Sequence, residues 1–157
     1  MAMERTMTSM TDIEQLLALE EIKKLKAQRD RACDTKDWGL YRALHADDHI
    51  SHNDGYERWD SADVMIANVK ALLDKGRTTV HHSHTPDITF ESPTKAKGIW
   101  GMEDYIFDSE TGDLLIHGFG FYHETYEKRD GKWLFTSRQL KRTLVREMPE
   151  AAFVQQN

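Results

Sequence analysis

The chain has 157 residues, a formal net charge of −6 at pH 7 and an isoelectric point near 5.7, and 31% of its residues are charged. This acidic balance argues against nucleic acid as a partner, because phosphate binding needs a basic surface. Four Trp, five Tyr and six Phe supply large apolar side chains for a core, which a disordered chain would lack.

The sequence also narrows the cellular context and the domain count. Cys33 is the only cysteine, so neither an internal disulfide nor a cysteine-based metal framework is expected. No run approaches the ~18–20 apolar residues of a membrane span, and the first residues, MAMERTMTSMTD, lack the apolar core of a secretory signal. We therefore expect a soluble cytoplasmic protein with one domain at 11–146, a flexible arm at 1–10 and a tail at 147–157.

The first two predicted helices follow each other closely. Thr11 and Glu14 match a capping box ahead of apolar residues at helical spacing, which predicts a helix over about 12–34. Asp37 can cap a short second helix over 38–46. A short strand and a turn at Asn53–Gly55 come next.

A third helix is predicted over 62–75, capped by Ser61 or Asp60 and ended by Gly76. The inward-facing residues expected on the second and third helices are Trp38, Tyr41, Leu44 or Leu40, Val64, Val69, Leu72 and Leu73.

After the third helix the pattern changes to strands. Four segments rich in β-branched and aromatic residues show partial period-two alternation, and Ser92–Pro93, SETGD and Asp130–Gly131 are turn signals between them. These segments are 78–91, 96–108, 114–129 and 132–145. Three helices followed by a run of long strands predict an α+β fold, a cone-shaped curved antiparallel sheet closed by three N-terminal helices. Its apolar interior would suit a small molecule.

The segment TTVHHSHTPDITF concentrates three of the eight histidines. On a strand His81 and His82 point to opposite faces, whereas His82 and His84 share one. A metal site would need a third ligand such as His117, His123 or an acid from a neighbouring strand. The alternatives are a general base, or histidines without a chemical role.

A catalytic histidine needs a carboxylate to fix its tautomer and to stabilise its protonated form. Asp30 and Asp34 are four residues apart, so they can share one face of the first helix. Asp34 follows Ala32–Cys33 at the helix end and is expected to be partly desolvated. It could equally serve only as a helix-end residue.

Three stretches together resemble one known family. They are IEQLLALEEIKKLKAQRDRACDTKDWGLYRALHADD, TTVHHSHTPDI and GFYHETYEKRDGKWLFTSRQLKR. The chain resembles the SnoaL-like branch of the nuclear transport factor 2-like superfamily over about Thr11 to Val145. The resemblance implies a cone-shaped α+β fold and cofactor-free proton abstraction by a His–Asp dyad, here His81 and Asp34. Arg29 stands where some dehydratases of the family carry a tyrosine.

The resulting hypothesis is a cofactor-independent lyase or isomerase, with no metal, that acts on a hydrophobic cyclic or aromatic small molecule. His81 would be the general base, and Asp34 would orient it. The expected substrate-binding residues, several of them candidate acids, are Tyr41, His52, His84, Trp100, Asp104 and Phe121. The alternative is a non-catalytic ligand-binding or small-subunit protein of a larger oxygenase. The resemblance also implies a homodimer or homotrimer paired through the outer face of the sheet.

Overall fold

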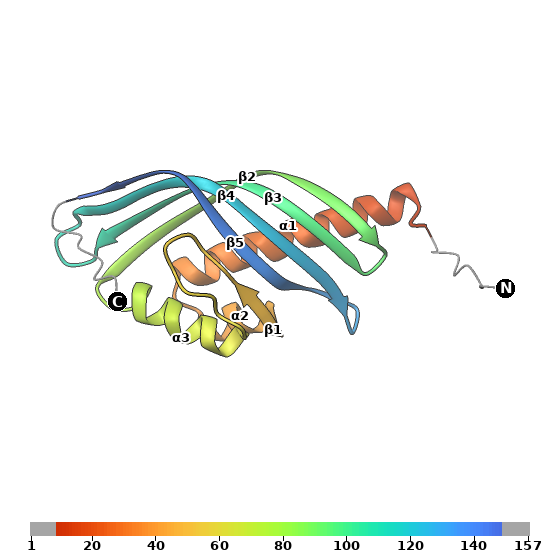
Figure 1. Ribbon diagram of the computed structural model, residues 1–157, viewed down its shortest axis with the longest axis horizontal. Helices are drawn as coiled ribbons and strands as arrows, with labels where there is room; N and C mark the ends of the chain where they lie inside the picture. Colours follow the sequence, from red (N-terminus) through yellow and green to blue (C-terminus); the bar gives the residue numbers. More distant parts are fainter. Residues whose placement is uncertain (1–8, 149–157) are drawn as a thin grey trace.

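The computed structural model describes residues 9–148, and in them a curved five-stranded sheet arches over three helices (Figure 1). The predicted arm and tail therefore lie mostly outside the described residues, in 1–8 and 149–157. The α+β class and the curved sheet confirm the fold prediction.

Helix α1 spans Asp12–Asp34 and begins as predicted with a capping box at Thr11 and Glu14. The Glu14 N–H donates to Thr11 Oγ1 at 3.3 Å, and the Thr11 N–H donates to Glu14 Oε2 at 2.8 Å. These two bonds satisfy backbone donors that a helix start leaves unpaired. The rest of α1 runs lengthwise beneath the sheet (Figure 1) and carries the catalytic candidate Asp34 at its last position.

The next elements differ from the predicted boundaries. Helix α2 covers only Trp38–Ala43, because strand β1, His45–Ser51, takes up the end of the predicted helix. Helix α3 spans Ala62–Leu73 with Ser61 as its cap. The prediction that Val64 faces inward is wrong, since it is 47% exposed. Ala62 and Met65 are buried instead, and the predicted Val69, Leu72 and Leu73 are partly buried and pack against the core.

The four predicted strands are present as β2, Arg77–Ser92; β3, Lys95–Asp108; β4, Leu114–Arg129; and β5, Lys132–Glu147. They pair antiparallel in the order β5-β4-β3-β2, as predicted. The prediction of an antiparallel sheet is wrong at one place, because β1 pairs with β5 in parallel. The sheet is also open rather than a closed barrel, with β1 and β2 as its edges, and β2 borders α1.

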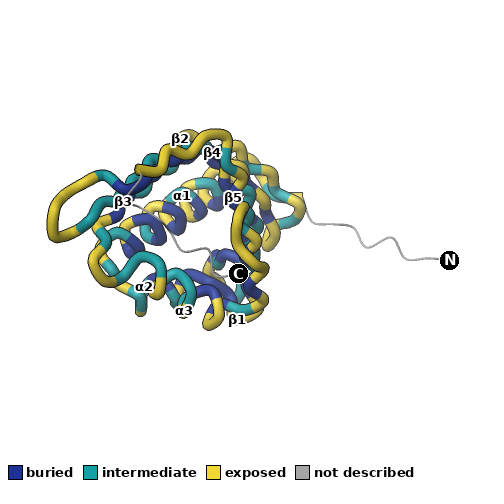
Figure 2. Tube along the Cα trace, turned by 60° about the vertical axis from the view of Figure 1, so that its left-hand side comes forward, coloured by how far each residue is buried: buried dark blue, intermediate teal, exposed yellow. Residues whose placement is uncertain are grey.

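The core lies between the inner face of the sheet and the helices, where Figure 2 shows the buried positions of α1 and the strands facing one another. It contains apolar residues together with an ion pair that needs extra room. Arg142 donates to both oxygens of Asp104 at 2.7 Å. A Cβ at Gly118 would overlap both side chains, so a glycine is required where β4 crosses beneath this pair.

Two buried histidines make the folded state sensitive to acid. The carbonyl of Phe135 accepts from His49 Nδ1 at 3.2 Å, which leaves Nε2 to accept from Ser51 Oγ at 2.9 Å, an arrangement suited to the neutral ring. Burial lowers the pKa of His49 to about 4 and lowers the pKa of His45 well below its ordinary value of 6.5.

The unfolded chain takes up protons on these rings below pH 6.5, whereas the folded chain resists until lower pH. We therefore expect the free energy of unfolding to fall between pH 6.5 and 4, with His49 alone contributing about 3 kcal/mol. Urea unfolding at several pH values in this window measures the loss. The His49→Gln variant is expected to lose less, and an equal loss in both proteins would contradict the assignment.

Candidate active site

His81 and Asp34 meet although 47 positions separate them in the chain. Asp34 Oδ1 lies 2.6 Å from His81 Nδ1, and Asp34 Oδ2 accepts the backbone N–H of His81 at 2.9 Å. The Asp34 carboxylate therefore contacts both the ring and the backbone of His81. With Nδ1 bonded to Asp34, the other ring nitrogen, Nε2, is the one left for a substrate.

Two further side chains support the carboxylate. Thr79 donates its hydroxyl proton to Asp34 Oδ1 at 2.9 Å, and Lys36 Nζ donates to the Thr79 oxygen at 2.8 Å. The backbone of Lys36 has a φ of 60°, a conformation uncommon for a residue with a side chain. This left-handed residue follows the end of α1 and lets the chain turn into α2 while its side chain reaches β2.

Strand alternation decides which histidine joins the dyad. Thr79, His81 and Ser83 point from β2 toward α1, where Thr79 and His81 bond Asp34, and Ser83 Oγ donates to Asp30 Oδ2 at 2.5 Å. His82 points the opposite way and is exposed. The two acids four residues apart on α1 thus meet alternate residues of one strand.

A cleft of about 740 Å³ opens between α1 and β2 beside the dyad. Most of its lining residues are polar or charged, and they include Lys23, Asp30 and Arg31 as well as the dyad. Ala27, Pro86 and Trp100 are the apolar members of this lining. The prediction of a closed, apolar cavity does not describe this cleft, since α1 presents charged side chains along it.

The interior next to the cleft carries charge as well. Lys26 Nζ donates to Glu124 Oε1 at 2.5 Å, and the Tyr126 hydroxyl donates to Glu124 Oε2 at 2.6 Å. Trp100 Nε1 in turn donates to the Tyr126 oxygen at 2.7 Å. Burial lowers the pKa of Lys26, and Glu124 opposes that shift. This network fixes Trp100 at the wall of the cleft.

Cys33 adds a thiol next to the dyad. Its Sγ, the Asp34 carboxylate and the His81 ring place ligand atoms within 4.8 Å of one another, the one such group among the described residues. Burial raises the pKa of the Cys33 thiol to about 11, so it stays protonated. A protonated thiol is a weak metal ligand and a weak nucleophile. The hydrogen-bonded pair of His81 and Asp34 is therefore the chemically useful part of this group.

The other predicted site residues are scattered. Trp100 lines the cleft, and His84 borders it, but the His84 ring turns toward Glu103 on the outer face of the sheet. Tyr41 and Asp104 are buried inside, engaged with Arg29 at 2.7 Å and with Arg142, so neither faces the cleft.

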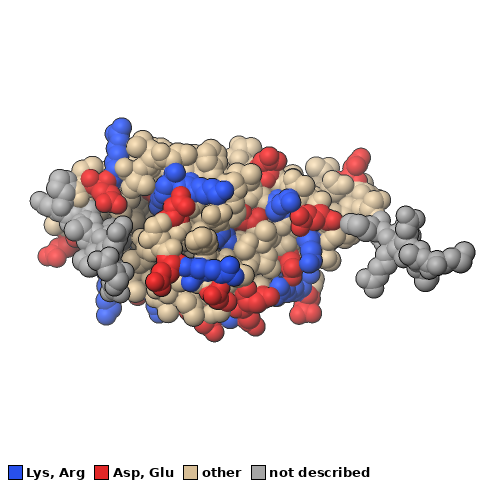
Figure 3. All heavy atoms as spheres, viewed as in Figure 1, with Lys and Arg blue, Asp and Glu red and all other residues tan. Residues whose placement is uncertain are grey.

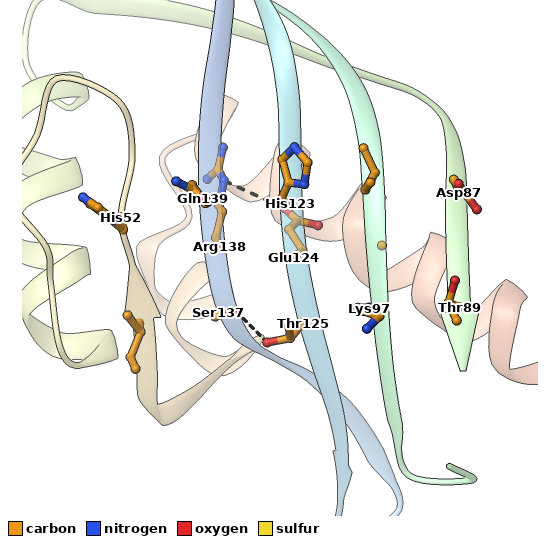
Figure 4. A pocket seen from close by; sticks show the side chains of 13 residues that line it. His52, Asp87, Thr89, Lys97, His123, Glu124, Thr125, Ser137, Arg138 and Gln139 are labelled. Carbon is orange, nitrogen blue, oxygen red and sulfur yellow. Dashed lines mark hydrogen bonds and ion pairs between the residues drawn. The ribbon is translucent and has the colours of Figure 1, made fainter. Parts of the chain in front are cut away.

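His52 and Phe121 lie away from the dyad. Figure 4 shows a second hollow, of about 390 Å³, lined by side chains of β2 to β5, with His52 beside it. Its lining residues Lys97 and Ile99 are exposed and alternate with buried ones, which places the hollow on the outer face. Phe121 is 45% exposed on that same face. The register that decides these faces was not readable from the sequence.

Thr79, Ser83, Lys26 and Lys36 were not predicted, although they surround the dyad. Alternation from His81 would have identified Thr79 and Ser83. No pattern in the sequence marks Lys36, because its role depends on a left-handed backbone at a helix end.

Among the described residues no helix is both long and apolar enough to cross a membrane. On the face seen in Figure 3, basic and acidic side chains are interspersed. No extended basic surface is present on that face.

The sequence and the fold are similar to those of known proteins. The model of the SnoaL-like domain matches residues 14–139. A putative scytalone dehydratase from Novosphingobium aromaticivorans superposes with a TM-score of 0.81 at 20% identity, covering 88% of this chain and 92% of that one. Hexachlorocyclohexane dehydrochlorinase LinA-type3 from Novosphingobium barchaimii gives 0.77 at 18% identity, with coverages of 88% and 95%.

A substituted form of Rv3472, a protein of unknown function from Mycobacterium tuberculosis, gives a TM-score of 0.73 at 18% identity, with coverages of 85% and 77%. At these identities the structures establish a shared fold, and the domain model carries the assignment further because it covers most of the chain, including the end of α1 and the start of β2. The chain belongs to the SnoaL-like domain family.

Proposed function

We propose that the protein is a cofactor-independent lyase or isomerase in which His81 is the general base. The observation that carries this proposal is the 2.6 Å contact between His81 Nδ1 and Asp34, with the side chain of His81 only 7% exposed. Similarity to a putative scytalone dehydratase and to dehydrochlorinases supports elimination chemistry. A scaffold protein would have no use for a desolvated pair of this kind.

In the proposed step, His81 Nε2 removes a proton from a substrate carbon. The electrons of that C–H bond form a double bond as a leaving group departs with its own bonding pair, or they move onto a carbonyl oxygen as an enolate. Asp34 accepts the Nδ1–H bond throughout and stabilises the imidazolium that forms. Thr79 and the backbone N–H of His81 keep the carboxylate in place.

The substrate we propose is a small cyclic or aromatic molecule with polar substituents. Trp100 and Pro86 provide apolar surface for a ring, and Lys23 and Arg31 provide donors for oxygen atoms at its edge. The volume of about 740 Å³ lies in the range of small-molecule sites.

Solvent deuterium exchange tests the proposal without a known product. A panel of cyclic ketones, hydroxylated aromatics and halogenated rings is incubated in D2O, and exchange or elimination is followed by NMR. His81→Gln is expected to lower the rate on the order of 10²–10⁴-fold, whereas His123→Gln, on the outer face of the sheet and outside the cleft, is expected to retain it. Equal rates in both variants would contradict the assignment of His81, and stable co-purification of an inactive protein with an oxygenase subunit would favour the non-catalytic alternative.

A further inference from the structure

Histidines from two strands meet one carboxylate on the outer face of the sheet. His117 of β4 places Nε2 2.9 Å from Glu103 Oε1, and His84 of β2 places Nε2 3.9 Å from Glu103 Oε2. His82 lies directly opposite Glu103 in the β2–β3 register. Three neighbouring strands thus bring three imidazoles toward a single acid, and the reaction proposed for His81 uses none of them.

We infer that His82, His84, Glu103 and His117 form a binding site for a divalent late transition-metal ion such as Zn²⁺. Imidazole nitrogen and carboxylate oxygen are ligands that these ions take. With bonds of about 2.0–2.2 Å, a tetrahedral ion holds neighbouring ligand atoms roughly 3.3 Å apart. The two nitrogen–oxygen distances at Glu103, 2.9 and 3.9 Å, lie on either side of that spacing.

Tyr105 already orients two of these groups. Its hydroxyl donates to Glu103 Oε1, and its ring stacks on His117 with centroids 4.1 Å apart. Hydrogen bonds from Tyr105 and His117 lower the pKa of the Glu103 carboxyl, which keeps it ionised. Metal sites in proteins commonly have such a partner behind the ligands, fixing their orientation.

The ligand atoms of this site do not yet all lie within 4.8 Å of one another, as those of Cys33, Asp34 and His81 do, so the site requires an inward rotation of His84. Its side chain is 58% exposed, so the rotation meets little packing. The ring lies over Gly101, where its Cδ2 is 3.9 Å from the position that a Cβ would take. A larger residue at position 101 would contact the ring, so the glycine leaves space for the imidazole to lie across β3.

Zn²⁺ binding to protein freed of metal, with any affinity tag removed, tests this inference. Isothermal titration is expected to show one equivalent bound per chain, and Cu²⁺ is expected to bind more tightly than Zn²⁺. His84→Ala, Glu103→Gln and His117→Ala are expected to weaken Zn²⁺ binding roughly 100-fold, and Tyr105→Phe about 10-fold. His123→Ala is the matched control, since His123 is on the same face in the hollow of Figure 4.

The outcomes separate this site from the dyad. Unchanged binding in His123→Ala and in His81→Ala, with loss in the three ligand variants, supports the inference. Absence of stoichiometric binding in the wild-type protein overturns it, and so does binding that disappears with His81→Ala or Cys33→Ser, which would place the ion at the dyad. Circular dichroism of each variant confirms that the fold is retained.

Discussion

Asp34→Asn is expected to reduce kcat about 10⁴-fold, a loss of the size associated with a wrong histidine tautomer. The backbone N–H of His81 is a donor that cannot change, and it points at Oδ2. The asparagine carbonyl oxygen must therefore take that position, which turns the amide NH₂ toward His81 Nδ1. Nδ1 then accepts, the proton moves to Nε2, and the ring can no longer act as a base.

Nitrogen-15 NMR of the imidazole measures the tautomer directly, alongside the rate of exchange or elimination. The wild-type ring is expected to carry its proton on Nδ1 and the Asp34→Asn ring on Nε2. Thr79→Val is the control, because it removes one neutral hydrogen bond to the carboxylate and leaves the tautomer alone. Its cost is expected to be at most roughly 10-fold. Full activity in Asp34→Asn would exclude Asp34 from the role proposed here.

Glu124→Gln is expected to destabilise the fold by about 3–5 kcal/mol, because it removes the carboxylate that pairs with the buried Lys26 and that also lies 3.8 Å from Arg138. The Lys26 and Glu124 side chains are 1% and 0% exposed, so water cannot solvate the remaining cation. For a chain of this length the loss corresponds to a decrease in Tm of roughly 6–20 °C.

Urea unfolding compares this variant with Glu20→Gln, which removes the exposed ion pair with Lys23. The exposed pair is expected to contribute no more than about 1 kcal/mol. A double variant, Lys26→Met with Glu124→Gln, is expected to recover most of the loss, since it removes both charges of the pair and keeps an acceptor for the Tyr126 hydroxyl. A single variant as stable as wild type would show that the interior tolerates an unpaired lysine.

Local signals predicted the helices and strands because each is determined by nearby residues. The capping box at Thr11, the cap at Ser61 and the turn at Asp130–Gly131 all lie where the sequence indicated. The parallel pairing of β1 with β5 was missed, since it joins residues far apart in the chain, as in His45 with Phe135. No local pattern carries that information.

The site was predictable to a similar extent. Spacing made Asp34 a candidate, and strand alternation separated His81 from His82, but the pairing of Asp34 with His81 came from resemblance. The charge next to the cleft was not predicted: α1 turns Lys26 and Arg29 into the interior, where buried partners neutralise them. A lysine in a helical pattern ordinarily indicates a solvent-exposed position, so charged side chains between α1 and the sheet could not be predicted from the sequence.

The alternation of β2 has a consequence for how this protein can change over evolutionary time. One residue gained or lost between Gly76 and His81 would shift every side chain of the strand to the opposite face. A loss would bring His82 to Asp34 and His81 opposite Tyr105, whereas a gain would bring Val80 to Asp34 and His81 opposite Glu103. Substitutions can be accepted along this stretch one at a time, but the number of residues between Gly76 and His81 must stay the same. Homologues that conserve the dyad should therefore place length variation in the hairpins and not here.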